Sequence, residues 1–467
     1  MKRITVVAVA ALTLAGCASF SPDGGSARVA EMTRERVGQK PVYQRTENQI
    51  DNARTRVSEL VRQPLTSDSA VELAFLNNRG LQASFSELGI AEAELVRAGR
   101  LRNPTFSFGR LREAGGIVEI DRAVMFDILG LLTLPIASDI EQRRFAQVQL
   151  QVAHEAVGLA AETRKAFFSA VAAQELVTYY LQVKEAADAS NELARRMVRA
   201  GNFNKLAQMR EQAFYADATS QLARAQYLAV VARERLSRLL GLSGTQTFML
   251  PDRLPELPQQ PIEPKDAEQT ALLTRLDVQM AKRATEHTAK SLGLTKTTSL
   301  INVLEVGYQN KSVSGEPRAN GYEIELALPL FDFGATRVAR AEATYMQAVH
   351  RTAQVAIDAR SEVRESYAAY RTSFDLARHY RDEVVPLRKR ISEENLLRYN
   401  GMLIGVFELL ADSRDQVTSV TGYLEALRDF WVAQTNLQTA LTGRSPGTGS
   451  AMSSSSSAGS SASSGGH

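Results

Sequence analysis

The chain has 467 residues, enough for two or three ordinary domains, and a formal net charge of +3 at neutral pH. This near balance of charge argues against a basic nucleic-acid-binding surface. Five histidines and one cysteine leave little material for a transition-metal site within one chain. We therefore expect no nucleic-acid partner, no metal and no catalytic site.

The first residues have the pattern of a bacterial secretion signal. A positively charged start, Met1-Lys2-Arg3, precedes an apolar run over residues 4–15 that is too short to span a bilayer as a helix. The run ends in Leu14-Ala15-Gly16-Cys17, which resembles a lipobox. We predict a signal peptide over 1–16 and a covalent lipid on Cys17. Ala18-Ser19 then resembles sorting to the outer membrane, with the lipid as anchor and no spanning helix.

The pattern next predicts an arm, a helix and a strand pair. Residues 17–66 are polar and weakly patterned, as in an extended arm with some helix. Ser67-Asp68 can cap a helix that runs to about residue 102, before Asn103-Pro104. Residues 105–108 and 117–126 then alternate around a turn at 114–116.

A second strand pair is predicted over 303–308 and 322–328. Its alternation places apolar side chains on one face and polar side chains on the other, as in a strand between lipid and a watery lumen. A half-buried soluble sheet would give the same alternation. If the strands enter a membrane, the lumen-facing candidates are Glu119, Asp121, Glu305, Glu323 and Glu325.

Very long helices follow both strand pairs. Residues 138–200 contain no proline, which predicts a helix of about 95 Å. Residues 335–399 form a similar stretch that Pro386 should kink. Glycine-containing corners lead to return helices, near 203–240 and 406–441, that Gly241 and Gly443 should end as left-handed caps. Apolar steps of three and four residues favour coiled-coil packing.

The order of predicted strands and helices occurs twice along the sequence. Leu132-Thr133-Leu134-Pro135 recurs as Leu326-Ala327-Leu328-Pro329 after 194 residues, and two further short matches lie at separations of 196 and 204 residues. We therefore predict a first repeat over 67–250 and a second over 266–443. A proline-rich segment over 251–265 would join them as a stiff linker, and the Ser/Gly-rich tail over 444–467 should be disordered.

One physical constraint narrows the function. A sheet inside a bilayer must close on itself, and closed membrane barrels need about eight strands. The chain supplies four predicted strands, so any barrel must be shared between copies. Together with such a barrel, the long helices and the lipid anchor would form a conduit through the periplasm.

From about residue 68 to 443, the chain resembles the TolC-type outer-membrane efflux proteins, in particular their lipoprotein members. The resemblance rests on the duplicated layout, the Leu-x-Leu-Pro strand exits, Phe331-Asp332-Phe333-Gly334, and Tyr399-Asn400-Gly401 before Glu408-Leu409-Leu410. It implies a mainly α-helical homotrimer with long coiled-coil helices and a shared 12-stranded β-barrel. It also implies an exit duct that docks on a periplasmic adaptor and an inner-membrane pump, and that catalyses no reaction.

Two features depart from the family pattern. The first strand-to-helix exit has Ala137-Ser138-Asp139 where the family has a Phe/Asp-Gly turn. At the inner tip, the two aspartates of the family correspond to Glu408 and Ala411, with Asp412 beside the latter. The candidate gate residues, acidic ones on one helical face and two neighbours that could hold the entrance shut, are Glu408, Asp412, Asp415, Arg398 and Tyr399.

A periplasmic coiled-coil scaffold lipoprotein without a membrane barrel is the alternative function. The strands distinguish the two hypotheses, because a scaffold needs no uninterrupted outward apolar face. The sequence identifies neither the transported substrate nor the pump.

Overall fold

The computed structural model describes residues 19–445, except 113, 244–246, 302 and 328–330. The predicted signal peptide, Cys17 and almost all of the predicted tail lie outside these residues. The described chain divides into two compact units, and each contains segments of both predicted repeats. The first holds residues up to Val29, Ala83–Ala153 and Asp277–Ile357, and the second holds Ala30–Gln82, His154–Leu276 and the residues from Asp358 onward.

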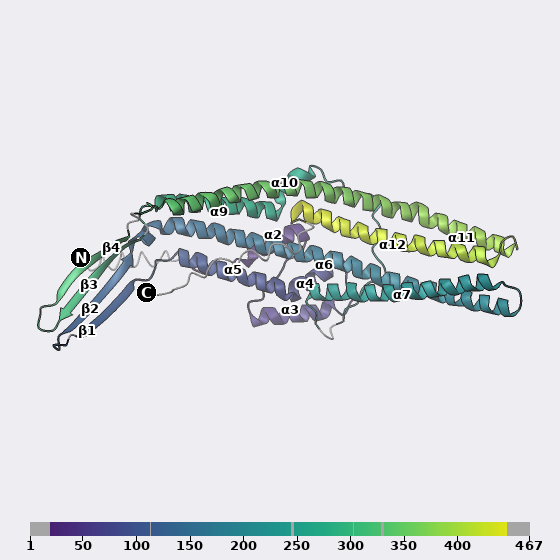
Figure 1. Ribbon diagram of the computed structural model, residues 1–467, viewed down its shortest axis with the longest axis horizontal. Helices are drawn as coiled ribbons and strands as arrows, with labels where there is room; N and C mark the ends of the chain where they lie inside the picture. Colours follow the sequence, from purple (N-terminus) through teal and green to yellow (C-terminus); the bar gives the residue numbers. More distant parts are fainter. Residues whose placement is uncertain (1–18, 113, 244–246, 302, 328–330, 446–467) are drawn as a thin grey trace. The chain divides into compact units, whose positions relative to one another are not determined.

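The first unit contains one four-stranded antiparallel sheet in the order β1-β2-β3-β4 (Figure 1). Both predicted strand pairs are confirmed, as β1 (Thr105–Arg112) with β2 (Val118–Asp127) and β3 (Val303–Val313) with β4 (Ala319–Ala327). The inner strands β2 and β3 also pair with each other, from Glu119 opposite Val313 to Asp127 opposite Glu305. The two hairpins therefore form a single sheet whose outer strands are β1 and β4.

Helical segments of the first unit are linked by polar contacts. They belong to α5 (Arg79–Ala98), α6 (Ile128–Arg199), α9 (Leu276–Thr297) and α10 (Ala335–His379). The Thr285 and Thr352 hydroxyls lie 2.8 Å apart, which joins α9 to α10. Lys290 of α9 approaches Asp139 of α6 at 3.8 Å. The Lys290–Asp139 contact therefore joins helices from the two halves of the sequence.

The second unit is built around a buried aromatic core. Besides parts of α6 and α10, this unit contains α2 (Ser26–Val37), α3 (Glu47–Leu60), α4 (Ser67–Asn77), α7 (Lys205–Leu240), α8 (Ala267–Thr274), α11 (Val385–Asn400) and α12 (Val406–Thr442). Phe430 is fully buried beside Tyr370 and Phe374, and Trp431 stacks on Phe168 at 5.2 Å. Among the described residues, no helix is both long and apolar enough to cross a membrane.

The helix predicted from Ser67 to residue 102 is wrong as one continuous element. Asn78 adopts an extended conformation and divides it into α4 and α5. The Asn78 side chain donates to the Leu239 carbonyl at 2.9 Å, and Asn77 donates to Leu240 and Gly241. The break therefore places two amides on the otherwise unsatisfied carbonyls at the end of α7.

The second half of the chain repeats this arrangement. Arg275 is extended and separates α8 from α9. Thr274 Oγ1 donates to the Leu441 carbonyl at 2.8 Å, and Arg275 Nη1 lies 3.4 Å from the Ala440 carbonyl. Arg275, with 1% of its surface exposed, also pairs with Glu362 at 2.8 Å. Each return helix is thus capped by a break in the helix that opens its own half.

The first predicted strand exit is also wrong. Leu132-Thr133-Leu134-Pro135 lies inside α6, which begins directly after β2 at Ile128. The Asp127 carboxylate accepts a hydrogen bond from the Gly130 amide at 2.6 Å, so it satisfies a backbone donor in the first turn. In the second half, Asp332 accepts from Gly334 and Thr336 before α10, with Phe333 and Gly334 at positive φ. The two exits therefore use different turns.

The second long helix is interrupted as predicted. A five-residue π-helix, Tyr380–Val384, separates α10 from α11, and Pro386 follows in the first turn of α11. Proline lacks the amide that an α-helix would use there, so the wider turn accommodates the missing donor. Gly241 ends α7 at φ 68°, as predicted. Gly443 does not form the predicted left-handed cap, because its φ is −111°, and a Cβ there would meet Val157 at 2.6 Å.

The proline-rich segment is held against the second unit by its backbone. Trp431 Nε1 donates to the Pro255 carbonyl at 3.0 Å, and the Tyr370 hydroxyl accepts from the Ile262 amide at 2.8 Å. The Leu254 amide donates to Glu175 at 3.1 Å, and burial raises the pKa of this carboxyl. The segment is therefore a fixed strap across several helices.

Replacing Arg275 with methionine should destabilise the second unit by about 3 kcal/mol, because Glu362 and the end of α12 lose a buried partner. Thermal unfolding of the purified protein measures this loss. Arg364→Gln is the control, since Arg364 and its partner Glu268 are both exposed at 3.4 Å, and such pairs contribute under about 1 kcal/mol. Equal shifts for the two variants would contradict the capping role of Arg275.

Candidate functional site

The register of the sheet gathers the predicted lumen residues on one face. Directly opposite residues of antiparallel strands share a face, so Glu119, Asp121 and Glu305 lie on the same side as Glu323 and Glu325. Glu305 stands opposite Glu325 on β4 and, on its other side, opposite Asp127 of β2. Like charges in direct opposition repel each other. Arg102 pairs with Asp127 at 3.2 Å, whereas no ion pair within the described chain engages Glu305, Glu323 or Glu325, so these three residues concentrate negative charge near the helices.

The other end of the same face is better compensated. Lys311 pairs with Glu119 across β2 and β3 and stands directly opposite Asp121. The structure thus brings all five predicted lumen residues onto one face but divides them into a paired group near the hairpin turns and a carboxylate-rich group near the helices.

The opposite face of the sheet is apolar and exposed. The exposed apolar members of this face are Phe106, Phe108, Phe126, Tyr308, Tyr322, Ile324 and Leu326. Near the helix end of the sheet, Leu131 and Leu132 of α6 and Phe331 of the second exit are also exposed. An uncovered apolar surface of this kind marks contact with a membrane or another protein.

The two helical corners in the second unit have the same hydrogen bonds but different residues. After α6, the amides of Gly201 and Asn202 donate to the carbonyls of Val198 and Met197. After α11, Met402 and Leu403 donate to Tyr399 and Arg398 in the same pattern, which is a Schellman cap. Gly201 has φ 76°, whereas Met402 adopts φ 58° with 92% of its surface exposed.

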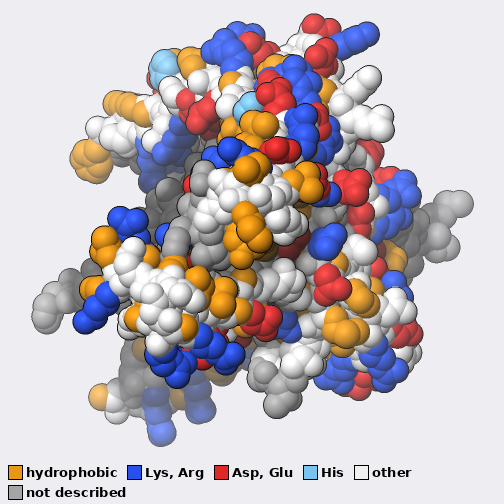
Figure 2. Space-filling model, turned by 90° about the vertical axis from the view of Figure 1, so that its right-hand side faces the viewer, with side chains coloured by type: hydrophobic (Ala, Val, Ile, Leu, Met, Phe, Trp, Pro, Cys, Tyr) orange, Lys and Arg blue, Asp and Glu red, His pale blue; other side chains and the backbone are white. Residues whose placement is uncertain are grey.

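Met402 therefore carries backbone strain that the first corner avoids, because left-handed angles crowd a side chain's Cβ. Its neighbours are apolar as well, with Leu397 and Leu403 exposed. Figure 2, which faces the ends of these helices, shows hydrophobic side chains among Lys and Arg. An apolar side chain held outward at such a cost suits contact with a partner.

The structure locates only part of the predicted gate. Asp415 of α12 is exposed and pairs with Arg388 of α11 at 3.0 Å. Arg398 and Tyr399 are exposed beside the corner. Glu408 and Asp412 belong to α12, but their side chains lie outside the described residues.

A buried polar network beside this tip was not predicted. The Arg414 guanidinium of α12 pairs with Glu211 of α7 at 3.0 Å and lies over the Phe214 ring. Glu211 is buried and also accepts from Ser190 of α6 at 2.7 Å. The network joins α6, α7 and α12. A buried glutamate at an apolar step of α7 was the available signal, but its partner lies 203 residues away.

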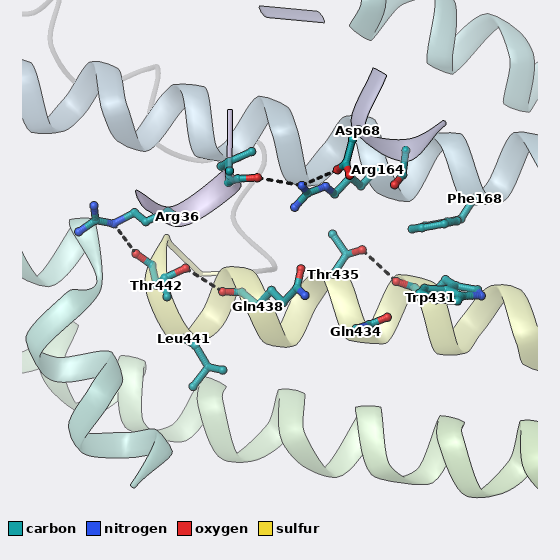
Figure 3. Close-up of a pocket in the computed structure, with 13 residues that line it drawn as sticks. Arg36, Asp68, Arg164, Phe168, Trp431, Gln434, Thr435, Gln438, Leu441 and Thr442 are labelled. Atoms are coloured by element: carbon teal, nitrogen blue, oxygen red, sulfur yellow. Dashed lines mark hydrogen bonds and ion pairs between the residues drawn. The ribbon is translucent and has the colours of Figure 1, made fainter. Parts of the chain in front are cut away.

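A cavity of about 500 Å³ lies between α2, α4, α6 and α12 (Figure 3). Arg36 donates from its guanidinium to the carbonyls of Met32, Thr274 and Thr442. Arg164 donates to the Val37 carbonyl and to Asp68, each at 3.0 Å. Both arginines are therefore engaged in joining helix ends, and burial lowers the pKa of Arg36 without discharging it.

The described residues contain no group of three or more His, Cys, Asp or Glu side chains arranged to hold a metal ion.

Comparison with known proteins finds one sequence match to a short attachment signal and one to a longer relative. The model of prokaryotic membrane lipoprotein lipid attachment sites matches residues 1–18, which include Cys17. The cobalt-zinc-cadmium resistance protein CzcC of Cupriavidus metallidurans is 25% identical over 286 residues, or 58% of this chain and 64% of CzcC. The chain thus matches less than two thirds of that relative's length.

Solved structures match almost the whole fold. CusC, described as forming a transmembrane channel, aligns with a TM-score of 0.68 at 16% identity, covering 84% of this chain and 92% of its own. A membrane protein from Pseudomonas aeruginosa gives 0.69 at 17% identity, with coverage of 83% and 92%. The outer-membrane channel OprN gives 0.67 at 19% identity, with coverage of 88% and 96%.

The chain is a lipoprotein with the fold of the TolC-type outer-membrane channels. The predicted resemblance is confirmed, and the lipid attachment site and this fold support the predicted lipid-anchored location in the outer membrane.

Met402→Gly should stabilise the α11–α12 corner by about 1 kcal/mol, because glycine adopts left-handed angles without a Cβ clash. Hydrogen exchange at the Leu403 amide, which bonds to the Arg398 carbonyl, measures the change as slower exchange. Gly201→Ala is the matched control at the other corner and should speed exchange at Asn202. Unchanged exchange in both variants would show that neither corner is strained.

Proposed function

We propose that the protein is the outer-membrane exit duct of a tripartite efflux pump. The observation that carries this proposal is a four-stranded sheet with one exposed apolar face, one acidic face and two outer strands without a second partner in the described chain. Hydrocarbon cannot satisfy the backbone groups of an open edge, so the sheet must close with other copies.

Closure by three chains gives a homotrimer with a 12-stranded barrel. The outer edge of β1 in one protomer would pair with the outer edge of β4 in the next. The acidic face would then line the lumen, and the apolar face would contact outer-membrane lipids. The long helices of α6, α10 and α11 and their return helices would continue the wall into the periplasm.

The helix corners are the proposed contact with a periplasmic adaptor, which connects the duct to an inner-membrane pump. Exposed Leu397, Met402 and Leu403 supply apolar contacts there. Glu408, Asp412 and Asp415 would form acidic rings around the entrance, with Arg398 and Tyr399 as residues that hold it closed. Asp415 is already engaged by Arg388, so Glu408 and Asp412 would carry most of the ring's charge.

Acidic groups at the entrance and in the lumen favour cations. The name of the relative CzcC refers to cobalt, zinc and cadmium. Divalent metal cations are therefore a suitable first class of cargo to test, although the pump selects what enters.

The lipidated protein should form heat-resistant trimers in detergent and conduct ions in a planar bilayer. A periplasmic scaffold would do neither, because its sheet would remain in water. The unlipidated Cys17→Ser protein should also require detergent to remain in solution. A monodisperse, detergent-free monomer of this variant would exclude the duct.

Removing the acidic groups should reduce the preference of the open channel for cations over anions. We expect Glu305→Gln with Glu325→Gln to lower this preference severalfold at low salt, because the lumen loses two carboxylates per chain and salt screens such charges. We expect Glu408→Ala with Asp412→Ala to weaken block by divalent cations. Reversal potentials in salt gradients measure the first effect and single-channel currents the second.

Glu342→Gln is the control for both pairs, since Glu342 lies on α10 and pairs with Lys296 at 2.7 Å. A lumen variant with the selectivity of this control would remove the acidic-lining assignment. Unaltered divalent block in the entrance variant would remove the ring alone.

A further inference from the structure

The apolar face of the first hairpin changes character toward its turn. Phe106 and Phe108 of β1 are followed on the same face by Arg110 and Arg112, all of them exposed. Leu111 lies on the opposite, acidic face. The alternation is therefore inverted beyond Gly109. Charged side chains are tolerated on a lipid-facing surface only close to its boundary, so on β1 the apolar band ends between Phe108 and Arg110, and Arg122 of β2, level with Phe108, also lies at its boundary.

Arg122 of β2 completes a basic group on this face. It stands directly opposite Phe108, so it is a diagonal neighbour of Arg110 at about 7–8 Å. Its Nη1 donates to Asn310 Oδ1 at 3.0 Å, and Asn310 Nδ2 donates to Asn320 Oδ1 at 2.7 Å. This row of amides holds the guanidinium in place across three strands.

The basic group lacks a compensating charge on its own face. Within the described part of the chain, no carboxylate forms an ion pair with any of the three arginines. Their acidic neighbours on β2, Glu119 and Asp121, lie on the opposite face, where Lys311 pairs with Glu119 and stands opposite Asp121. Three positive charges therefore remain directed outward beside an apolar band.

We propose that Arg110, Arg112 and Arg122 bind the phosphate groups of a membrane lipid. This inference rests on the proposed function, which places the apolar face against the bilayer. Guanidinium groups match phosphate oxygens in charge and geometry. Phe106, Phe108 and Ile120 flank the arginines and would contact the acyl chains of the same lipid, which favours a lipid over free phosphate.

The second hairpin offers no such site. At the corresponding level of the sheet, the outward face of β3 and β4 carries Asn310, Ser312 and Asn320, which are uncharged. Each chain would therefore bind phosphorylated lipid at its first hairpin only. The bound lipid would belong to the membrane leaflet that the hairpin turns reach.

Native mass spectrometry of the full-length lipidated trimer with diphosphorylated lipid A as the probe tests this site. Replacing the three arginines with glutamine should lower lipid binding about tenfold or more, because charge-assisted hydrogen bonds to phosphate are lost. Arg195→Gln with Arg196→Gln and Arg199→Gln is the matched control, since it removes the same charge from the end of α6. Monophosphorylated lipid A should bind wild-type protein more weakly than the diphosphorylated form, and inorganic phosphate should not displace either.

Several outcomes would overturn the inference. Equal binding by the glutamine variant and the control would do so, as would equal binding of the two lipids. Displacement by inorganic phosphate would show a general anion site in place of a lipid site. If the glutamine variant fails to form trimers, an arginine-to-lysine triple variant, which keeps the charge but loses the bidentate geometry, should bind the lipid more weakly than wild type, and binding as tight as that of wild type would count against the guanidinium site. Wild-type protein that forms no trimer would contradict the proposed duct, whereas a conducting trimer without selective lipid binding would contradict this inference alone.

Discussion

The two outer edges of the sheet constrain everything else in this protein. β1 and β4 each have one neighbouring strand in the described chain, so their outer backbone groups need further partners. In water, unpaired strand edges would promote aggregation, and in hydrocarbon the free-energy cost of their unsatisfied backbone groups would be prohibitive. The exposed aromatic and aliphatic side chains on one face make water a poor environment for this sheet. The proposed assembly of several copies would satisfy both the edges and the face.

The helices depend on a different device, which occurs once in each half. An extended residue interrupts the helix that opens the half, and its side chain reaches the end of the returning helix. Leu239 and Ala440, the carbonyls that accept from Asn78 and Arg275, are 201 positions apart, as are Gly201 and Met402 at the corners. Both ends of the return helix are therefore in the same register in the two halves, which gives the wall a regular construction.

The periodicity of the sequence was sufficient for the strands and the long helices, because local alternation and the absence of proline determine these elements. It was insufficient for the helix breaks, since the carbonyl that accepts from Asn78 lies 161 residues away. The pairing of Arg414 with Glu211 was not predictable for the same reason, because the two residues lie on return helices of different halves. The Leu-x-Leu-Pro matches were misleading, since one lies in a helix and the other begins in a strand.

The face assignment of the five acidic sheet residues followed from alternation alone, because a strand has a strict period of two. The compensation of Glu119 by Lys311 did not, because it requires the register between β2 and β3. Those two strands come from different halves of the chain. Sequence pattern therefore placed the five acidic residues on one face of the sheet but could not predict how their charge is distributed along that face.

The differences between the halves matter most where the construction is otherwise regular. Glycine at one corner corresponds to a strained methionine at the other, an asparagine cap corresponds to a buried arginine, and a basic hairpin face corresponds to an amide-rich one. In a trimer the six half-units would alternate around the axis, so each of these differences would occur three times. The backbone of the wall would thus be nearly sixfold symmetric, whereas the residues that differ between the halves would follow threefold symmetry. The capping contacts that both halves share give stability, whereas a gate, an adaptor contact and a lipid site each require features that only one half provides.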